Sequence, residues 1–270
     1  MALTTVGLQG LLSASGSTDM SFLIGTAINP YRANIDLAIE SFDDTGFAST
    51  APVAVSKISG VKSWTGGFSG RFPKASPASG HEGLVTYASG YVLGCHGWGI
   101  TASAQSLPNT GFASTPPTWH EYLSGLYSFT GFFDVRIDDT TALASVGTSG
   151  TATFRLSTES TNDNELSGTI ITTGRSTPIE VGGVPVVRYT FDVDGNLSVD
   201  GDAPLFDVTA AGTPDPLVRP ESTAITLRAN GDIDYTGNAF LTGWSVNCAV
   251  GSIVDVSGTF QGTGALTDNS

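Results

Sequence analysis

The string Thr45-Gly46-Phe47-Ala48-Ser49-Thr50 occurs a second time, unchanged, as Thr110-Gly111-Phe112-Ala113-Ser114-Thr115. The copies lie 65 residues apart, and further identities keep this spacing on both sides without a gap. They include Ile35 with Ile100, Ser41 with Ser106, Pro52 with Pro117, Ser59-Gly60 with Ser124-Gly125, Thr65-Gly66 with Thr130-Gly131, Phe68 with Phe133 and Arg71 with Arg136. A fixed internal period indicates a repeated structural module. We therefore predict one strand–loop–strand module built twice, over residues 35–72 and 100–137.

The segment after the second copy has the clearest secondary-structure pattern in the chain. Its apolar positions alternate with polar or mixed ones over nine residues, which is typical of a strand with one buried face. The predicted buried face carries Phe129, Gly131, Phe133, Val135 and Ile137. Shorter alternations recur at 35–39, 152–156, 187–191, 225–227, 233–235, 240–248 and 254–260. Without an amphipathic helix of ordinary length, these strands predict an all-β fold, a β-sandwich or barrel-like domain with long loops.

Local patterns add detail to this prediction. Asp194-Gly195-Asn196 and Asn230-Gly231 have the residues of hairpin turns. Trp64, Phe68 and Phe72 are expected to share one strand face, as are Phe240, Thr242, Trp244, Val246 and Cys248. Gly97-Trp98-Gly99-Ile100 is echoed by Gly243-Trp244-Ser245-Val246, and we interpret both Trp residues as core residues. Residues 1–20 are predicted to be an N-terminal arm, and residues 21–270 the β domain.

The composition limits the classes of function. Charged residues make up 13% of the chain, about half the usual share, which favours extensive subunit contact over a weakly charged monomer. The net charge of −14 argues against holding nucleic acid by its phosphates, because such contacts need Lys and Arg. An acidic surface past which DNA slides without sticking remains compatible with this charge.

Cysteine usage and the N-terminus bear on the compartment. Cys95 and Cys248 lie far apart in apolar runs, so we expect buried free thiols and a reducing compartment. The N-terminus has neither a basic region nor a long apolar stretch, so we expect no signal peptide. The apolar runs are too short to cross a bilayer. We therefore expect a soluble protein with no membrane contact.

Catalytic and metal-binding patterns are weak. His81, His96 and His120 have no His or Cys partner at metal-binding spacing, and no serine-nucleophile, phosphate-binding or dinucleotide motif is present. The acidic run Asp192 to Asp202 offers oxygen ligands for Ca²⁺, but its Gly is misplaced for a calcium loop and no closing Glu follows. A solvated hairpin tip is the simpler interpretation. We predict no catalytic residues, no metal, no cofactor and no enzyme activity.

The C-terminal run from Gly243 to Thr267 resembles the closing segment of major tail tube proteins of long-tailed (siphovirus-type) bacteriophages. In that family a Trp-bearing strand, a short Gly turn and a strand ending near Phe-Gln-Gly-Thr-Gly close the sheet. The segments Thr45 to Phe72 and Thr110 to Ile137 are also similar, each with a Thr-Gly loop before a Ser-aromatic-Thr-Gly strand. The resemblance covers about half of the chain.

This resemblance implies a structural virion protein that forms homo-oligomeric rings, usually of six subunits. The rings stack into a tail tube that encloses the tape measure protein and later conducts DNA without sequence-specific binding. Its partners would be itself, the tape measure protein, and the tail terminator and tail-tip proteins. It would be assembled in the host cytoplasm and located in the virion tail. Six-fold symmetry and three-fold symmetry with duplicated domains both stay open.

On this interpretation the repeated loops contact neighbouring subunits. The predicted interface residues are Thr45, Phe47, Ser49, Thr110, Phe112 and Ser114, with the two Phe residues as anchors. Alternatively, both Phe residues pack on their own domain. A carbohydrate-binding or adhesin-like module is another possibility, resting on Trp119-His120-Glu121-Tyr122. A capsid decoration or tail-tip protein is a third.

Overall fold

A computed structural model describes twelve segments of the chain, and the structural statements below concern these segments only. They are residues 11–14, 29–43, 57–71, 84–87, 90–91, 94–111, 119–136, 145–155, 165–177, 185–199, 222–230 and 233–268. Every regular element in them is a β-strand, as predicted. The strands are β1 (Leu11–Ala14), β2 (Asn29–Asp43), β3 (Lys57–Arg71), β4 (Leu84–Tyr87), β5 (Gly90–Tyr91), β6 (Cys95–Pro108), β7 (Tyr122–Arg136), β8 (Ser149–Arg155), β9 (Glu165–Ser176), β10 (Val186–Val199), β11 (Thr223–Asn230), β12 (Ile233–Ala249) and β13 (Asp255–Asp268).

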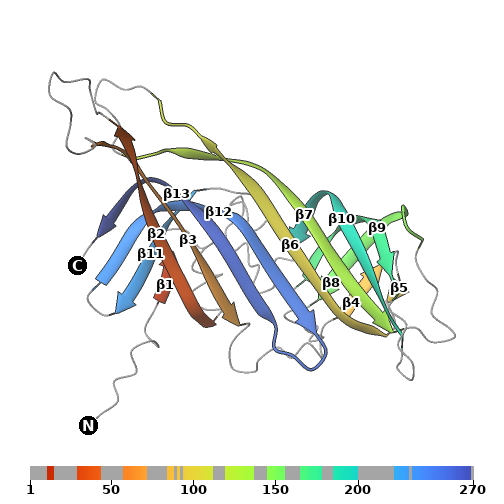
Figure 1. The fold of residues 1–270 in the computed structure, drawn as a ribbon. Coiled ribbons are helices and arrows are strands. Elements are labelled where there is room, and N and C mark those ends of the chain that lie inside the picture. Colours follow the sequence, from red (N-terminus) through yellow and green to blue (C-terminus); the bar gives the residue numbers. More distant parts are fainter. Residues whose placement is uncertain are drawn as a thin grey trace, which may run out of the picture.

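The strands form one 13-stranded sheet, and all the paired strands run antiparallel. Its main path runs β2-β3-β13-β12-β6-β7-β10-β9-β8-β4-β5, and Figure 1 shows this path crossing the molecule from β2 to β9. The sheet branches at β12, which pairs with β13 along one edge. On its other edge, the first half of β12 pairs with β11 and the second half with β6.

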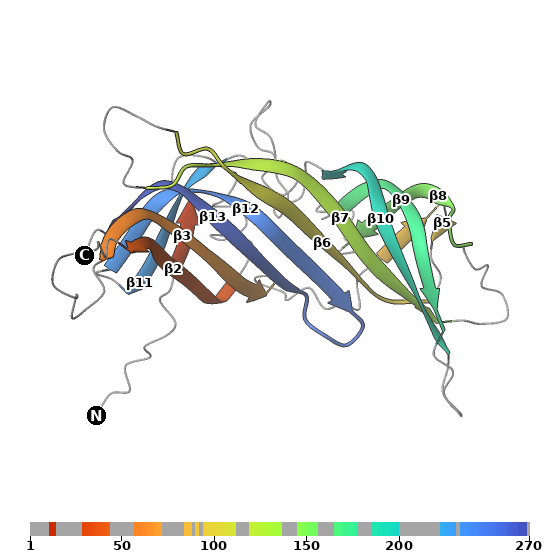
Figure 2. The same ribbon diagram turned by 45° about the horizontal axis from the view of Figure 1, so that its top comes forward.

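Twelve of the strands form two six-stranded units with the same pairing pattern, and the short strand β5 pairs with β4 outside them. Unit A has the order β1-β11-β12-β13-β3-β2, and unit B has the order β4-β8-β9-β10-β7-β6. In each unit the first strand lies close to the last, β1 to β2 and β4 to β6, so each unit is barrel-like. All of unit B is inserted in the chain between β3 and β11 of unit A. The two units lie side by side in Figure 2.

The predicted repeat corresponds to the hairpins β2–β3 and β6–β7. Ile35 pairs with Gly66, and Ile100 pairs with Gly131, each 65 residues later. Both hairpins also shift register at equivalent places. These places are Pro30/Arg32 and Ile39/Ser41 in the first hairpin, and Cys95/Gly97 and Ala104/Ser106 in the second. The sequence repeat therefore preserves pairing and β-bulges as well as residue identity.

The correspondence extends to strands in which the sequence repeat is not evident. Phe260 of β13 pairs with Gly66, and Phe191 of β10, 69 residues earlier, pairs with Gly131. The same shift of 69 relates β12 to β9, including the bulge before the paired glycines Gly243 and Gly174. Both units therefore have the same register from the hairpins through the following two strands.

The paired Phe and Gly residues explain how each unit packs its core. A Cβ atom on Gly66 would lie 2.3 Å from Cζ of Phe260, and one on Gly131 would lie 2.4 Å from Cζ of Phe191. Each Phe ring thus covers the Gly opposite it. In unit A, Trp64 also lies against Gly262 and donates a hydrogen bond from Nε1 to the carbonyl oxygen of Gly264, at 3.1 Å.

The predicted buried face of β7 is confirmed where it is described, because Phe129, Phe133 and Val135 are buried. Gly131 lies between them on this face, and Ile137 lies outside the described residues, as does Phe72 of the β3 face. The core interpretation of Trp98 and Trp244 is also confirmed, because they are 1% and 3% exposed.

Two sequence predictions about β12 and β10 are wrong, both because of bulges. A register shift between Leu241 and Gly243 places Leu241 with Trp244 in the core, so Phe240 does not share their face. Asp194-Gly195-Asn196 is not a hairpin turn, because β10 continues beyond it and pairs again with β9 at Ser198. Gly195 has a φ of +86° at this bulge, a conformation that glycine adopts without strain.

The remaining local predictions concern the turn at Asn230-Gly231 and the N-terminal arm. The hairpin at Asn230-Gly231 is confirmed, because Asn230 pairs with Ile233 and β11 runs antiparallel to β12. The predicted N-terminal arm includes a strand, β1, which pairs with β11 from Leu11 to Ala14.

Candidate assembly interface

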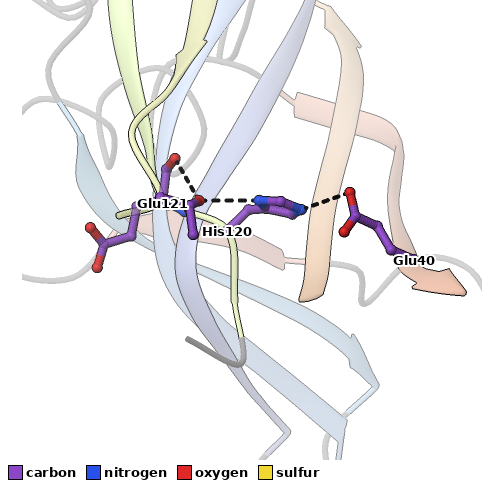
Figure 3. Close-up of polar contacts among 4 residues, drawn as sticks. Glu40, His120 and Glu121 are labelled. Carbon is purple, nitrogen blue, oxygen red and sulfur yellow. Dashed lines mark hydrogen bonds and ion pairs between the residues drawn. The ribbon is translucent and has the colours of Figure 1, made fainter. Parts of the chain in front are cut away.

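Of the six residues predicted at a subunit interface, the structure describes only Thr110. Thr45, Phe47, Ser49, Phe112 and Ser114 lie outside the described residues. Thr110 is half-buried where β6 leaves the sheet. Its Oγ1 accepts a hydrogen bond from the backbone N–H of Glu121 at 2.9 Å and lies 3.1 Å from Nδ1 of His120 (Figure 3). Thr110 therefore holds the two sides of its own hairpin together.

Residues 119–122, which precede and begin β7, lie on unit A. His120 Nε2 is 3.2 Å from Oε1 of Glu40 on β2 (Figure 3). The His120 backbone N–H donates to the Lys62 carbonyl at 2.8 Å, and its carbonyl accepts from the Gly264 N–H at 2.9 Å. The hairpin of unit B is thus anchored to three strands of unit A.

Two neighbouring contacts strengthen this anchorage. The ammonium group of Lys62 lies over the Trp119 ring, 5.5 Å from its centroid, a cation–π contact. The Tyr122 backbone N–H donates to Oγ1 of Thr263 at 3.0 Å, and that hydroxyl donates to the Tyr122 carbonyl at 3.2 Å. The stretch that suggested a carbohydrate-binding module therefore makes contacts within the chain.

The two units meet where β12 pairs with β6, and we call this pairing the inner junction. It runs from Gly243 opposite Ser103 to Ala249 opposite Gly97. Trp244 packs against Phe129 of β7, with ring centroids 6.4 Å apart. The two Gly-Trp stretches noted in the sequence both lie on this junction, and they meet where Val246 pairs with Ile100.

The inner junction also carries a hydrogen bond between the units. The Tyr127 hydroxyl of unit B donates to the carbonyl oxygen of Leu241 in unit A at 2.9 Å. Strand pairing, an aromatic contact and this hydrogen bond therefore join the two units.

At both outer ends of the repeated array, a described strand has an edge that no other described strand pairs with. Within the described part of the chain, β2 pairs with β3 only. On β9, the strand β8 covers residues up to Ile171, and the backbone of Thr148 pairs with Thr172. Beyond that point, no described strand pairs with the outer edge of residues 173–176. An unpaired edge is a template for another strand.

Exposed apolar side chains gather on β2 and on the β6–β7 hairpin. Of the exposed large apolar residues that the structure describes, the majority lie there: Leu37, Ile39, Phe42, Leu107, Leu123 and Leu126. Leu126 is 93% exposed and Leu37 is 57% exposed. Scattered exposed apolar residues are ordinary, but clustered ones mark interaction surfaces.

The sheet face opposite the core is rich in hydroxyl groups, and we call it the hydroxyl face. Paired side chains bond across neighbouring strands, at 2.8 Å for Ser245 with Ser257 and 2.9 Å for Ser103 with Ser128. Asp36, Asp192 and Asp194 are exposed on this face. Its basic side chains include Arg32 and also Arg188, which Asp134 binds through two contacts of 2.7 Å.

The cysteines are free, as predicted. Burial raises the pKa of the Cys95 thiol to about 11 and that of Cys248 to about 12. Both thiols are therefore protonated at neutral pH, and thiolate chemistry at them is disfavoured.

The described segments contain neither a cluster of metal ligands nor a helix able to span a membrane. No group of three His, Cys, Asp or Glu side chains is placed there to hold a metal ion. Asp192 and Asp194 of the predicted acidic cluster are exposed, while Asp200 and Asp202 lie outside the described residues. In the same segments no helix has the length and apolar character to cross a membrane.

The sequence matches no known protein-family model and no curated protein. The candidate interface therefore rests on the geometry described above.

Proposed function

We propose that the protein is a structural subunit that polymerises as stacked homo-oligomeric rings into the tail tube of a long-tailed bacteriophage. The observation that carries this proposal is the side-by-side repetition of one β unit within a single sheet. A unit that already pairs edge-to-edge with its own copy is suited to extend that pairing to further copies. Repeated units of this kind bury their surfaces against neighbours.

The exposed apolar side chains support assembly. Leu107 pairs with Leu123 on the β6–β7 hairpin, and Phe42 pairs with Ile58 at the equivalent place on β2–β3. Both hairpins extend beyond the strands that flank them in the sheet (Figure 1). We propose that these apolar hairpin segments contact the next ring in the stack.

The hydroxyl face supports a role as the lining of a channel. Hydroxyl groups bonded to each other offer no cationic contact to a phosphate, and exposed carboxylates repel it. DNA would pass such a surface without being held, and the tape measure protein would occupy the same channel before ejection. The tail terminator and tail-tip proteins would cap the two ends.

Electron microscopy of the purified full-length protein over a range of concentrations tests this proposal. We expect rings or tubes of constant diameter. A protein that stays monomeric at every concentration, or that binds glycans without assembling, would contradict the proposal. Particles that only coat another protein shell would instead identify a capsid decoration protein.

A further inference from the structure

The inner junction provides a template for a contact between copies of the chain. It pairs β12 of unit A with β6 of unit B. The equivalent strands are β9 in unit B and β2 in unit A, and each of these has an edge stretch that no other described strand pairs with. The open edge of β2 therefore corresponds to the edge of β6 at the inner junction, and the open edge of β9 corresponds to that of β12.

Equivalent apolar residues are more exposed on the open edge of β2 than on β6 at the inner junction. Ile100 and Ala102 on β6 are 0% and 1% exposed at the inner junction. The equivalent residues on β2 are Ile35, which is partly buried, and Leu37, which is 57% exposed. Apolar side chains thus occupy positions on the open edge that are covered where a neighbouring unit is present.

We propose that β2 of one copy of this chain pairs with residues 174–177 of the next copy, at the end of β9 and one residue beyond it, in the register of the inner junction. This inference rests on the proposed function and specifies its subunit contact. Transferring the observed pairs of β12 and β6 sets four pairs: Gly174 with Ala38, Arg175 with Leu37, Ser176 with Asp36, and Thr177 with Ile35.

The side chains at these positions are complementary. At the inner junction the large Trp244 lies opposite the small Ala102. At the outer contact Arg175 lies opposite Leu37, so its aliphatic stem covers the Leu side chain while its charged group stays in water. Arg175 thus takes the place of Trp244, and Leu37 takes the place of Ala102.

A second contact point carries opposite charges. Within the chain, the backbone of Tyr122 bonds to the side chain of Thr263. The equivalent residues at the outer contact are Lys57 and Asp194, both exposed. The Lys57 ammonium of one copy would meet the Asp194 carboxylate of the next.

This contact uses different surfaces on the two copies, so it propagates in one direction, and it gives a ring when the rotation between successive copies closes the circle. Units A and B then alternate around the ring, which contains twice as many units as chains.

Cysteine cross-linking of the full-length protein tests the register. Leu37→Cys and Arg175→Cys are combined in one chain, assembled and oxidised, and the products are separated without reducing agent. Directly opposite residues meet the distance needed for a disulfide, so we expect a ladder of dimers and larger multimers. The single variants control for the native cysteines. Asp36→Cys with Arg175→Cys controls for register, because a slip of one residue turns the side chain to the other face.

Charge reversal provides a second readout. Lys57→Glu should raise the concentration needed for assembly at least about tenfold, because it places like charges together. Adding Asp194→Lys should restore assembly. Tubes that form without the disulfide ladder, or a ladder that is equally strong in the register control, would overturn the inference and leave the proposed function standing. A protein that never assembles would overturn both.

Discussion

Substitution of the paired glycines Gly66 and Gly131 by Ala tests whether the two units are structurally equivalent. A Cβ atom on Gly66 would lie 2.3 Å from Cζ of Phe260 and 2.4 Å from the carbonyl oxygen of Asn34. A Cβ atom on Gly131 would lie 2.4 Å from Cζ of Phe191 and 2.5 Å from the carbonyl oxygen of Gly99. The obstructing atoms are the same at both sites, so the two substitutions should have similar effects.

The size of the expected destabilisation follows from these distances. Moving the Phe ring alone does not relieve the clash, because the second obstruction is backbone of the neighbouring strand. Overpacking of this kind typically costs about 1–3 kcal/mol, and we expect each Ala variant to lower the free energy of unfolding by that amount. Gly111→Ala is the matched control. A Cβ atom there meets nothing within 4 Å, so its stability should stay the same or rise by less than about 1 kcal/mol.

Urea unfolding of the unassembled protein, followed by tryptophan fluorescence, measures these differences. The midpoints of Gly66→Ala and Gly131→Ala should fall together, while that of Gly111→Ala should not fall. A fall in the urea midpoint for one of the two variants without a comparable fall for the other would refute the equivalence of the units.

Three further predictions concern the junction, the thiols and the hairpin surface. Tyr127→Phe removes the hydrogen bond to Leu241 and should destabilise the protein by about 0.5–1.5 kcal/mol in urea unfolding; an unchanged midpoint would show that the bond contributes nothing. Burial raises the pKa of Cys95 to about 11 and that of Cys248 to about 12. The contribution of these two buried thiols to the free energy of unfolding is therefore fully present below the pKa of an unfolded thiol, about 8.5, and is lost as the pH rises towards 11–12. Urea unfolding at pH 7–11 should therefore show a fall in the free energy of unfolding that becomes smaller when both cysteines are replaced by Ala. An equal fall in that variant would contradict this account. Leu126→Asp should reduce tube length in electron micrographs more than the same change at exposed Val146, and equal effects would exclude the hairpin as a ring-stacking contact.

The sequence predicts the hairpins well because their information is local. Alternation sets the buried face of a strand, and the identities around Phe47 and Phe112 set equal spacing in both copies. Bulges are harder to predict because one extra residue reverses the faces beyond it. The bulge at Thr242 separates Phe240 from Trp244 in this way. The apolar Leu241 interrupts the alternation next to it but does not show where the extra residue lies.

The nested arrangement of units A and B could not be predicted from the sequence. Thr242-Gly243-Trp244-Ser245 and Thr173-Gly174-Arg175-Ser176 share three residues, too few to identify a repeat without the pairing partners. The order of copies is also reversed between the hairpins and the later strands, since unit B lies within the chain of unit A. A search for one fixed period therefore finds only the hairpins.

The predicted contact of the repeated loops with neighbouring subunits stays a prediction, because every contact described for them lies within one chain. Within the chain, the described part of the second loop lies against unit A, and His120 contacts Glu40 there. These residues are 80 positions apart in the sequence, so only the pairing of β12 with β6 brings them together. The open edges of β2 and β9 are a property of the whole sheet and have no local signal.

The central claim is that one chain supplies two equivalent units to a closed ring. Native mass spectrometry of the isolated ring gives the number of chains, and end-on electron microscopy class averages give the number of repeated lobes. We predict twice as many lobes as chains. Equal numbers of lobes and chains would contradict the account.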